Sequence, residues 1–254
     1  MARCGPRGLT RQCIREKLPV VTTDDHELDG LDPYLLLDAE AQRIDDSLSR
    51  VPPPRWDEPS RCEGWSVRDV VCHLAATERY HRACLDRDEA THFAAGAAEG
   101  LESLAGWNER GVREFDGVSA LDVLEQWRQS NAETRRGFRA ADDSDIDSSI
   151  GAYPARWQAF HVASELATHA DDMGVPVLAG ERDGRRAWRA RVSRFALAEA
   201  KPEVAVTKDD GLTTVSSDVV TVSVDDDRLI EAVAGRLPTA ALDNDSRSLL
   251  SITP

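Results

Sequence analysis

Four stretches of helical periodicity constrain the fold of this chain most strongly. Each runs for about 20 residues, carries apolar side chains at helical spacing and opens on a capping residue or a proline. They are expected over Asp32–Val51, from Ser66 to about Asp86, from Ser119 or Asp122 to about Ala140, and from about Pro154 to Gly174. Helices of this length with short-to-medium connections favour an antiparallel bundle. We therefore expect a four-helix bundle over residues 31–180.

Two segments between these helices have a less definite pattern. Ala90–Gly106 is rich in Ala and Gly, and its pattern does not decide between helix and loop. Asp142–Ser149 carries several acidic residues and is expected to be a polar loop.

The chain changes character after about residue 180. A helix is expected over Arg185–Ala200 and a shorter one over Leu229–Ala234. Short β-branched runs separated by Asp and Gly turns have the pattern of strands. These runs are Glu203–Thr207, Leu212–Ser216, Val219–Val224 and Ser248–Ile252. We expect a small α+β domain over residues 181–254, and a disordered or irregular basic extension over residues 1–30.

The composition argues against several functional classes. The net charge of −15 would repel phosphate backbones, so nucleic-acid binding is not expected. No apolar run approaches the roughly 20 residues needed to cross a bilayer. The five cysteines are odd in number and form no C-x-x-C pair, so neither a disulfide framework nor a zinc ribbon is expected. We interpret them as reduced thiols of a cytoplasmic protein, with Cys62 and Cys84 structural.

The fourth helix carries an ionisable stripe at four-residue spacing, formed by His161, Glu165 and His169. Residues four apart share one helical face, so a carboxylate and an imidazole placed in this way can hold one metal ion. One ion cannot reach across both intervals, which together span roughly 12 Å. Spacing alone leaves two pairs open, His161 with Glu165 or Glu165 with His169. A solvated ion pair is the simpler alternative, but the apolar neighbours Val162 and Leu166 favour a drier face.

A further ligand is expected from a facing helix, because metal sites in bundle cores draw their ligands from several helices. His73 on the second helix is the candidate. Its neighbours Val70, Val71 and Leu74 place it at or near the core. A buried histidine that is hydrogen-bonded to a neighbouring group is the alternative interpretation.

Two segments resemble the mycothiol-dependent maleylpyruvate isomerase family, which belongs to the wider DinB-like group of metal-binding helical bundles. Pro59–Leu74 contains Cys-x-Gly-Trp, followed by a capped helix that carries Asp and then His-Leu. Ala163–Asp172 is similar to the family's Glu-x-x-x-His-x-x-Asp. The two segments occur in order, and the resemblance spans roughly residues 30 to 250. Near its end, Ala234-Gly-Arg236 is similar to a late Gly-Arg of the family.

The resemblance implies a metal site made of His73, Glu165 and His169, because the matching residues of the family bind a divalent metal, usually zinc. It thereby selects Glu165 with His169 over the other pair. Asp172 is then expected to lie behind the ligands, where it can orient an imidazole. His161 is the remaining nearby candidate for a supporting contact or a fourth ligand.

Candidates for contacts with the substrate and the thiol lie on the second helix. Tyr80 follows His73 by seven residues and so lies on the same side, where it can meet the substrate; ordinary core packing is the alternative. Arg79 and Arg82 are candidates to bind carboxylates of a thiol cofactor or a substrate. Exposed surface charge is the alternative for both arginines.

The resemblance implies an enzyme that uses a divalent metal, expected to be Zn²⁺, to activate a small thiol, expected to be mycothiol. The thiol would serve S-transfer to, or cis–trans isomerisation of, an electrophilic small molecule. Two alternatives stay open: a hydrolase that uses metal-bound water, and a non-catalytic, zinc-stabilised binding or sensor protein. We expect a cytoplasmic monomer or homodimer with small-molecule partners and no nucleic-acid or membrane partner.

Overall fold

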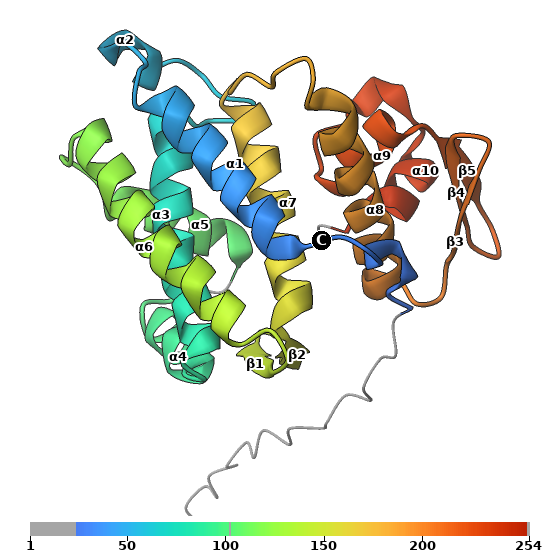
Figure 1. The fold of residues 1–254 in the computed structure, drawn as a ribbon, viewed down its shortest axis with the longest axis horizontal. Coiled ribbons are helices and arrows are strands. Elements are labelled where there is room, and N and C mark those ends of the chain that lie inside the picture. Colours follow the sequence, from blue (N-terminus) through green and yellow to red (C-terminus); the bar gives the residue numbers. More distant parts are fainter. Residues whose placement is uncertain (1–23, 102, 253–254) are drawn as a thin grey trace, which may run out of the picture.

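A computed structural model of the chain describes residues 24–101 and 103–252. Four long helices pack together as a bundle (Figure 1), with α3 against α6 and α1 against α7. The helices are α1 (Pro33–Leu48), α3 (Val67–Leu85), α6 (Ala120–Ala140) and α7 (Ala155–Asp172). The chain is mainly α-helical, as predicted, with a smaller α+β part at its C-terminal end.

Local capping explains where the bundle helices begin. The Asp32 carboxylate accepts hydrogen bonds from the N–H groups of Tyr34 and Leu35 at the start of α1. Ser66 and Asp69 form a reciprocal capping box at the start of α3. Such caps satisfy N–H groups that have no partner within their own helix. The predicted helix starts at these two positions are therefore confirmed.

The bundle encloses one continuous hydrophobic core. Trp127, Phe138 and Phe160 are almost completely buried in it. Each such side chain contributes roughly 1.5–3 kcal/mol when it is removed from water. This core holds α3 and α7 in fixed positions, which matters because the predicted metal ligands lie on these two helices.

Shorter helices and a β-hairpin pack beside the four long helices. The undecided segment forms α4 (Glu89–Ala98) and the first residues of α5 (Leu104–Arg113), both beside α3, and the short α2 (Pro53–Trp56) follows α1. The predicted polar loop over Asp142–Ser149 is wrong, because β1 (Asp145–Ser148) pairs antiparallel with β2 (Gly151–Pro154). Ile146 lies opposite Tyr153 in this hairpin and both are buried, so the acidic residues around them alternate outward.

The C-terminal part combines helices with a small antiparallel sheet. Its strands follow the order β3 (Ala205–Asp209), β4 (Leu212–Ser216) and β5 (Thr221–Val224), and its helices are α8 (Arg182–Ala200), α9 (Asp226–Val233), a 3₁₀ turn (Thr239–Ala241) and α10 (Asn244–Leu250). The strand predicted over Ser248–Ile252 is wrong. Asp243 caps α10 through Ser246 N–H, and helical spacing buries Leu249 and Leu250 in a second hydrophobic cluster.

Helix α8 contributes to both hydrophobic clusters. Its residues Trp188 and Phe195 pack in the bundle core, whereas Leu197 packs in the C-terminal cluster. A domain boundary near residue 180 stays a prediction. Most of the predicted N-terminal extension lies outside the described residues, and a short 3₁₀ turn (His26–Leu28) inserts Leu28 into the bundle core. Within the described ranges, no helix is long and apolar enough to span a membrane.

Replacing Ser66 by Ala tests the capping box of α3. The variant loses the acceptor for Asp69 N–H, and we expect the free energy of unfolding to fall by about 1 kcal/mol. Ser66→Asn keeps an acceptor and should retain most of the stability. Ser130→Ala is a matched control, because the Ser130 hydroxyl donates to carbonyls of its own helix. Urea denaturation measures each variant, and equal losses in Ser66→Ala and Ser130→Ala would contradict the expectation.

Candidate metal centre

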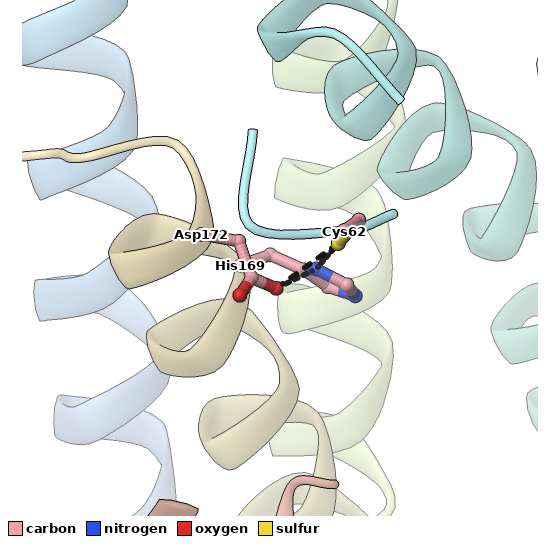
Figure 2. Close-up of side chains that lie close together, drawn as sticks. All are labelled: Cys62, His169 and Asp172. Carbon is pink, nitrogen blue, oxygen red and sulfur yellow. Dashed lines mark hydrogen bonds and ion pairs between the residues drawn. The ribbon is translucent and has the colours of Figure 1, made fainter. Parts of the chain in front are cut away.

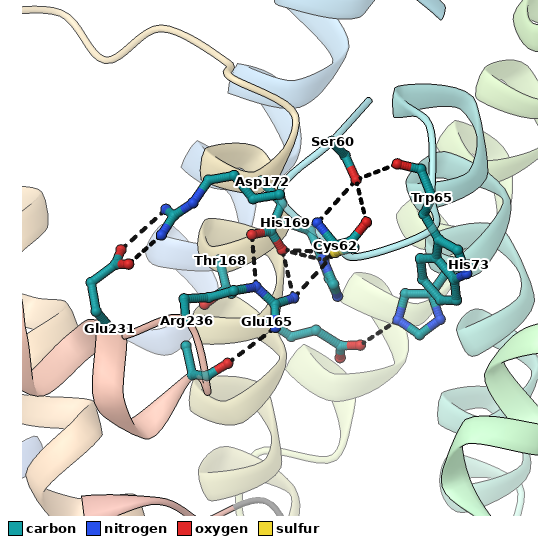
Figure 3. Close-up of polar contacts among 12 residues, drawn as sticks. Ser60, Cys62, Trp65, His73, Glu165, Thr168, His169, Asp172, Glu231 and Arg236 are labelled. Carbon is teal, nitrogen blue, oxygen red and sulfur yellow. Dashed lines mark hydrogen bonds and ion pairs between the residues drawn. The ribbon is translucent and has the colours of Figure 1, made fainter. Parts of the chain in front are cut away.

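The structure brings together the three residues expected to hold a metal. His73 comes from α3, whereas Glu165 and His169 come from successive turns of α7 (Figure 3). His73 Nε2 lies 3.5 Å from Glu165 Oε1, and the rings of His73 and His169 lie edge to face at 4.9 Å between centroids. One ligand atom from each of the three residues falls within 4.8 Å of the others. The four-residue spacing on α7 and the packing of α3 against it therefore bring the three side chains to one place.

Glu165 is shared between two histidines of α3. Its Oε1 faces His73, and its Oε2 lies 3.7 Å from Nε2 of His81. Burial works to raise the pKa of Glu165, but the contacts with His73 and His81 outweigh it and hold the pKa well below its usual range. Burial also opposes a charge on His81, yet Glu165 raises the pKa of His81. The carboxylate is therefore ionised and available to a cation.

His81 was missed by the sequence reasoning. It is buried one residue after Tyr80, and its Nδ1 has no hydrogen-bond partner in the described part of the chain. A signal was available, since His73 and His81 both fall in the buried stripe of one helix, eight residues apart. The sequence does not show that Glu165 lies opposite His81. The buried stripe alone therefore does not distinguish a residue of the site from a residue that only packs in the core.

Asp172 lies behind His169, as the resemblance implied. Its Oδ2 accepts a hydrogen bond from His169 Nδ1 at 3.0 Å (Figure 2), which leaves Nε2 of that ring for a metal. Burial disfavours a charged imidazole, but the bonds to Asp172 and Cys62 outweigh it and raise the pKa of His169 to about 9. A metal that binds Nε2 of His169 would have to displace the proton that the charged imidazole carries there. We therefore expect the affinity for the metal to rise with pH.

Arg236 completes the group around Asp172 from the C-terminal part. Its Nε and Nη2 each donate to the Asp172 carboxylate at 2.8 Å, in a bidentate pair (Figure 3). The Asp172 side chain is fully buried. Burial would raise its pKa, yet Arg236 and His169 hold the pKa of Asp172 well below its usual range. The Gly-Arg similarity noted in the sequence therefore marks a residue that touches the candidate centre.

Cys62, expected to be structural, lies against the candidate centre, and a structural role stays a prediction. Its Sγ lies 3.2 Å from Asp172 Oδ2 and 3.9 Å from His169 Nδ1 (Figure 2), and 3.2 Å from Arg236 Nη2 (Figure 3). The loop that carries it is shaped by Ser60, whose hydroxyl accepts from Cys62 N–H and donates to the carbonyl of Trp65. The Trp65 ring in turn lies 5.2 Å from the His73 ring. Cys62 thus belongs to the candidate centre.

Two overlapping sets of ligand atoms share His169: His73 with Glu165, and Cys62 with Asp172. Two ligands held about 2.1 Å from a tetrahedral ion lie about 3.4 Å apart. The 3.5 Å between His73 and Glu165 fits that spacing. In the second set, the Arg236 guanidinium already occupies the Asp172 carboxylate and opposes another cation there. The set of His73, Glu165 and His169 therefore fits a metal better.

A cavity of about 570 Å³ opens beside this centre. His73 lines it together with two of the predicted contact residues, Arg79 and Tyr80. The Tyr80 hydroxyl accepts from Ser149 N–H at 3.2 Å. A space of this size suits a small organic molecule. The centre and a substrate-sized cavity thus meet at His73.

Two other predicted residues lie elsewhere. Arg82 is not part of the cavity lining, and its guanidinium lies 3.5 Å from Asp86 on the helix surface. His161 does not join the three ligands: its Nε2 lies 2.9 Å from both the Tyr153 hydroxyl and the Glu199 carboxylate. It connects α7 to β2 and α8 instead. The stripe of three ionisable residues on α7 is therefore split between two separate contacts.

Comparison with known proteins gives a family for the bundle. The sequence pattern of the family described as "Mycothiol maleylpyruvate isomerase N-terminal domain" matches residues 37–174. That range covers more than half of the chain and contains all three candidate ligands. The chain belongs to this family.

Two further similarities accompany the family match. An uncharacterised protein of Mycobacterium tuberculosis, from strains CDC 1551 and H37Rv, is 27% identical over 107 residues, which is 42% of this chain and 41% of the relative. The chain therefore matches less than half the length of these curated relatives. A crystal structure of a histidine-to-alanine mutant of a mycothiol-dependent maleylpyruvate isomerase is similar over 66% of this chain and 68% of that one, with 19% identity and a TM-score of 0.47.

The cysteines of this family member should differ in reactivity. Burial raises the pKa of the Cys72 and Cys84 thiols to about 11, and both side chains are inaccessible. At pH 7 only about one in 10,000 such thiols is ionised. Among the three cysteines that the structure describes, Cys62 is partly exposed, so we expect iodoacetamide to modify it in the folded protein, and Cys72 and Cys84 only after denaturation. Peptide mass mapping reads each site separately, and equal rates in the folded protein would contradict the prediction.

Arg236→Gln tests the buried pair with Asp172. Because the Asp172 carboxylate would stay buried with one cationic partner fewer, we expect the free energy of unfolding to fall by about 2–3 kcal/mol. Arg228→Gln, on the exposed side of α9, is the matched control and should change stability little. The stabilisation exists above the ordinary Asp pKa of about 3.9 and is lost as the pH falls toward the lower folded-state pKa. The stability difference between variant and wild type should therefore shrink below about pH 4; a pH-independent difference would contradict this origin.

Proposed function

We propose that this protein holds a divalent metal, Zn²⁺, through His73, Glu165 and His169, and uses it to activate a small thiol toward an electrophilic small molecule. The observation that carries the proposal is the meeting of this ligand set with a substrate-sized cavity at His73. Membership of a family described by mycothiol and maleylpyruvate isomerase supports mycothiol as the thiol.

Three residues would bind the ion, and the residues around them would orient these ligands. Two imidazoles and one carboxylate are typical of a catalytic zinc site, which keeps a further position open. Held by this set, Zn²⁺ would lower the pKa of a bound thiol, so that the thiolate would form near neutral pH. Asp172 fixes the His169 ring through Nδ1, and Arg236 fixes Asp172 in turn. His81 holds the second oxygen of Glu165 and so limits its rotation.

The reaction class follows from thiolate chemistry. The sulfur forms a bond to an electrophilic alkene carbon, and the π electrons move onto a conjugated carbonyl. Rotation about the resulting single bond, followed by expulsion of the thiolate, converts a cis alkene into its trans isomer. If the adjacent carbon is protonated instead, the product is a thioether. Isomerisation and S-transfer therefore share one site, and the cavity selects between them.

The cavity wall supports this reaction with polar groups near the metal ligands. Burial raises the pKa of Tyr80, so its hydroxyl stays protonated and can donate a hydrogen bond to a substrate oxygen. Tyr80 and His73 line the same cavity. We therefore propose Tyr80 as a residue that orients the electrophile.

A purely structural zinc site is less well supported than a catalytic one. Structural sites use four protein ligands. His161, the fourth ligand expected on α7, contacts Tyr153 and Glu199 instead. The three-ligand set therefore favours an open position for a thiol over a closed site.

Metal analysis of single variants tests the proposal. We expect the wild-type protein to hold about one equivalent of Zn²⁺, and His73→Ala or His169→Ala to lose it, because two ligands bind far more weakly than three. His161→Ala is the matched control on α7 and should keep the metal. Full metal content in both ligand variants would contradict the assignment.

Cobalt substitution tests the thiol. Mycothiol should change the visible spectrum of the Co²⁺-loaded protein, because a sulfur ligand adds charge transfer to the metal. A spectrum that does not respond to mycothiol, together with hydrolysis of esters or amides, would favour a hydrolase.

Asp172→Asn should weaken metal binding by about 10–100-fold, the usual effect of removing the partner that orients a ligand.

A further inference from the structure

The cavity beside His73 has an aromatic wall, of which the proposed chemistry uses only Tyr80. Tyr80 on α3, His92 and Phe93 on α4, and Trp107 on α5 line it together. His92 stacks on Trp107 at 5.1 Å between ring centroids, with 27° between the planes. Phe93 meets Trp107 edge to face at 5.7 Å, and Tyr80 lies 5.8 Å from Phe93. The four rings form one continuous surface facing the cavity.

This aromatic wall is uncharged near neutral pH. Burial, with the positive charge of Arg79 nearby, lowers the pKa of His92, which favours the neutral imidazole. Burial raises the pKa of Tyr80, which favours the neutral phenol. The rings therefore offer stacking and apolar contact rather than ionic attraction.

The backbone is adapted to this wall. A side chain added at Gly96 would place its Cβ 2.0 Å from two ring atoms of Trp107. A Cβ at Gly111 would lie 2.7 Å from Ala76 Cβ, where α5 approaches α3. Two glycines thus allow α4 and α5 to bring the Trp107 ring against the cavity. Another residue type at either position would displace it.

The charges around the cavity already neutralise one another. Within the part of the chain that the structure describes, two arginines and two glutamates line it. Arg79 pairs with Glu114, and Arg110 pairs with Glu114 at 2.7 Å and with Glu99 at 2.9 Å. An entering carboxylate would meet both glutamates and compete with them for each guanidinium. A dicarboxylate is therefore a poor fit.

We infer that the cavity takes an uncharged molecule with one or two aromatic ring systems, single or fused, stacked on the Phe93 and Trp107 surface, in preference to a dicarboxylate. As a statement about the electrophile, this rests on the proposed function. It implies that the substrate of this chain differs in charge from a maleylpyruvate-like acid, although the resemblance implies the same metal ligands for the family. Specificity would then lie in α4 and α5, and the chemistry in α3 and α7.

A pair of fluorescent probes tests the inference by binding alone. Phenylnaphthylamine is uncharged, whereas anilinonaphthalene sulfonate has similar rings and one negative charge. We expect saturable one-to-one binding of the uncharged probe and affinity for the sulfonate at least about tenfold weaker. Maleate should displace the uncharged probe no better than chloride at equal ionic strength. Equal affinity for the two probes, or displacement by maleate, would overturn the inference.

Variants locate the binding surface. Phe93→Ala and Trp107→Ala should each weaken binding of the uncharged probe by about tenfold, because each removes a stacking partner. Leu178→Ala removes an exposed apolar side chain outside the cavity and should leave the affinity unchanged. Circular dichroism checks that the variants fold. If both ring variants fold and keep wild-type affinity, the inference fails.

A charge variant tests the second half of the argument without altering the rings. Glu99→Gln combined with Glu114→Gln leaves Arg79 and Arg110 without their carboxylate partners. It should raise affinity for the sulfonate by about tenfold and leave the uncharged probe unaffected. No gain for the sulfonate would contradict the role of the two glutamates.

The experiment is run on both metal-free and Zn²⁺-loaded protein without thiol. Failure of probe binding would therefore overturn the inference about the cavity and leave the metal centre intact. Failure of the ligand variants to lose metal would overturn the proposed function and leave the cavity result standing.

Discussion

The buried carboxylate of Asp172 is the constraint on which the site depends. A carboxylate with no exposed surface needs several partners, because an unpaired buried charge is strongly destabilising. Its partners come from three separate parts of the chain: His169 on the same helix, Cys62 in the loop before α3, and Arg236 after α9. Satisfying this one group fixes the end of α7, the approach to α3 and the docking of the C-terminal part together.

The two carboxylates of the centre have different environments and so different roles. Asp172 pairs with a guanidinium and an imidazole, whereas the partners of Glu165 among the described residues are two histidines, at distances of 3.5 and 3.7 Å. Those separations exceed an ordinary hydrogen bond and are close to the spacing of ligands around one ion. The geometry therefore distinguishes Asp172, three residues after His169, as an orienting carboxylate from Glu165, four residues before it, as the proposed ligand.

The helices were predictable because their determinants are local. Asp32 and Ser66 are predicted as caps from their local sequence, and the family resemblance selects Glu165 with His169 from the stripe on α7. The remainder depended on contacts between distant residues. Cys62 and Arg236 lie 110 and 64 residues from Asp172 in sequence, so no local pattern connects them. The predictions for the β1–β2 hairpin and for α10 were wrong for a related reason. Short segments with mixed patterns take the structure that buries their few apolar residues.

Ala90–Gly106, the segment of the bundle whose structure was hardest to predict from sequence, also lines part of the cavity. Ala- and Gly-rich α4 carries a weak helical pattern partly because Gly96 is placed for close approach to Trp107, and Gly111 near the end of α5 allows a similar approach to Ala76. Helix propensity is sacrificed there for a particular surface. The proposed metal ligands instead lie on strongly patterned helices that pack in the bundle core. A fold divided in this way can keep its chemistry fixed while the wall of the cavity changes, so family membership constrains the reaction more closely than the substrate.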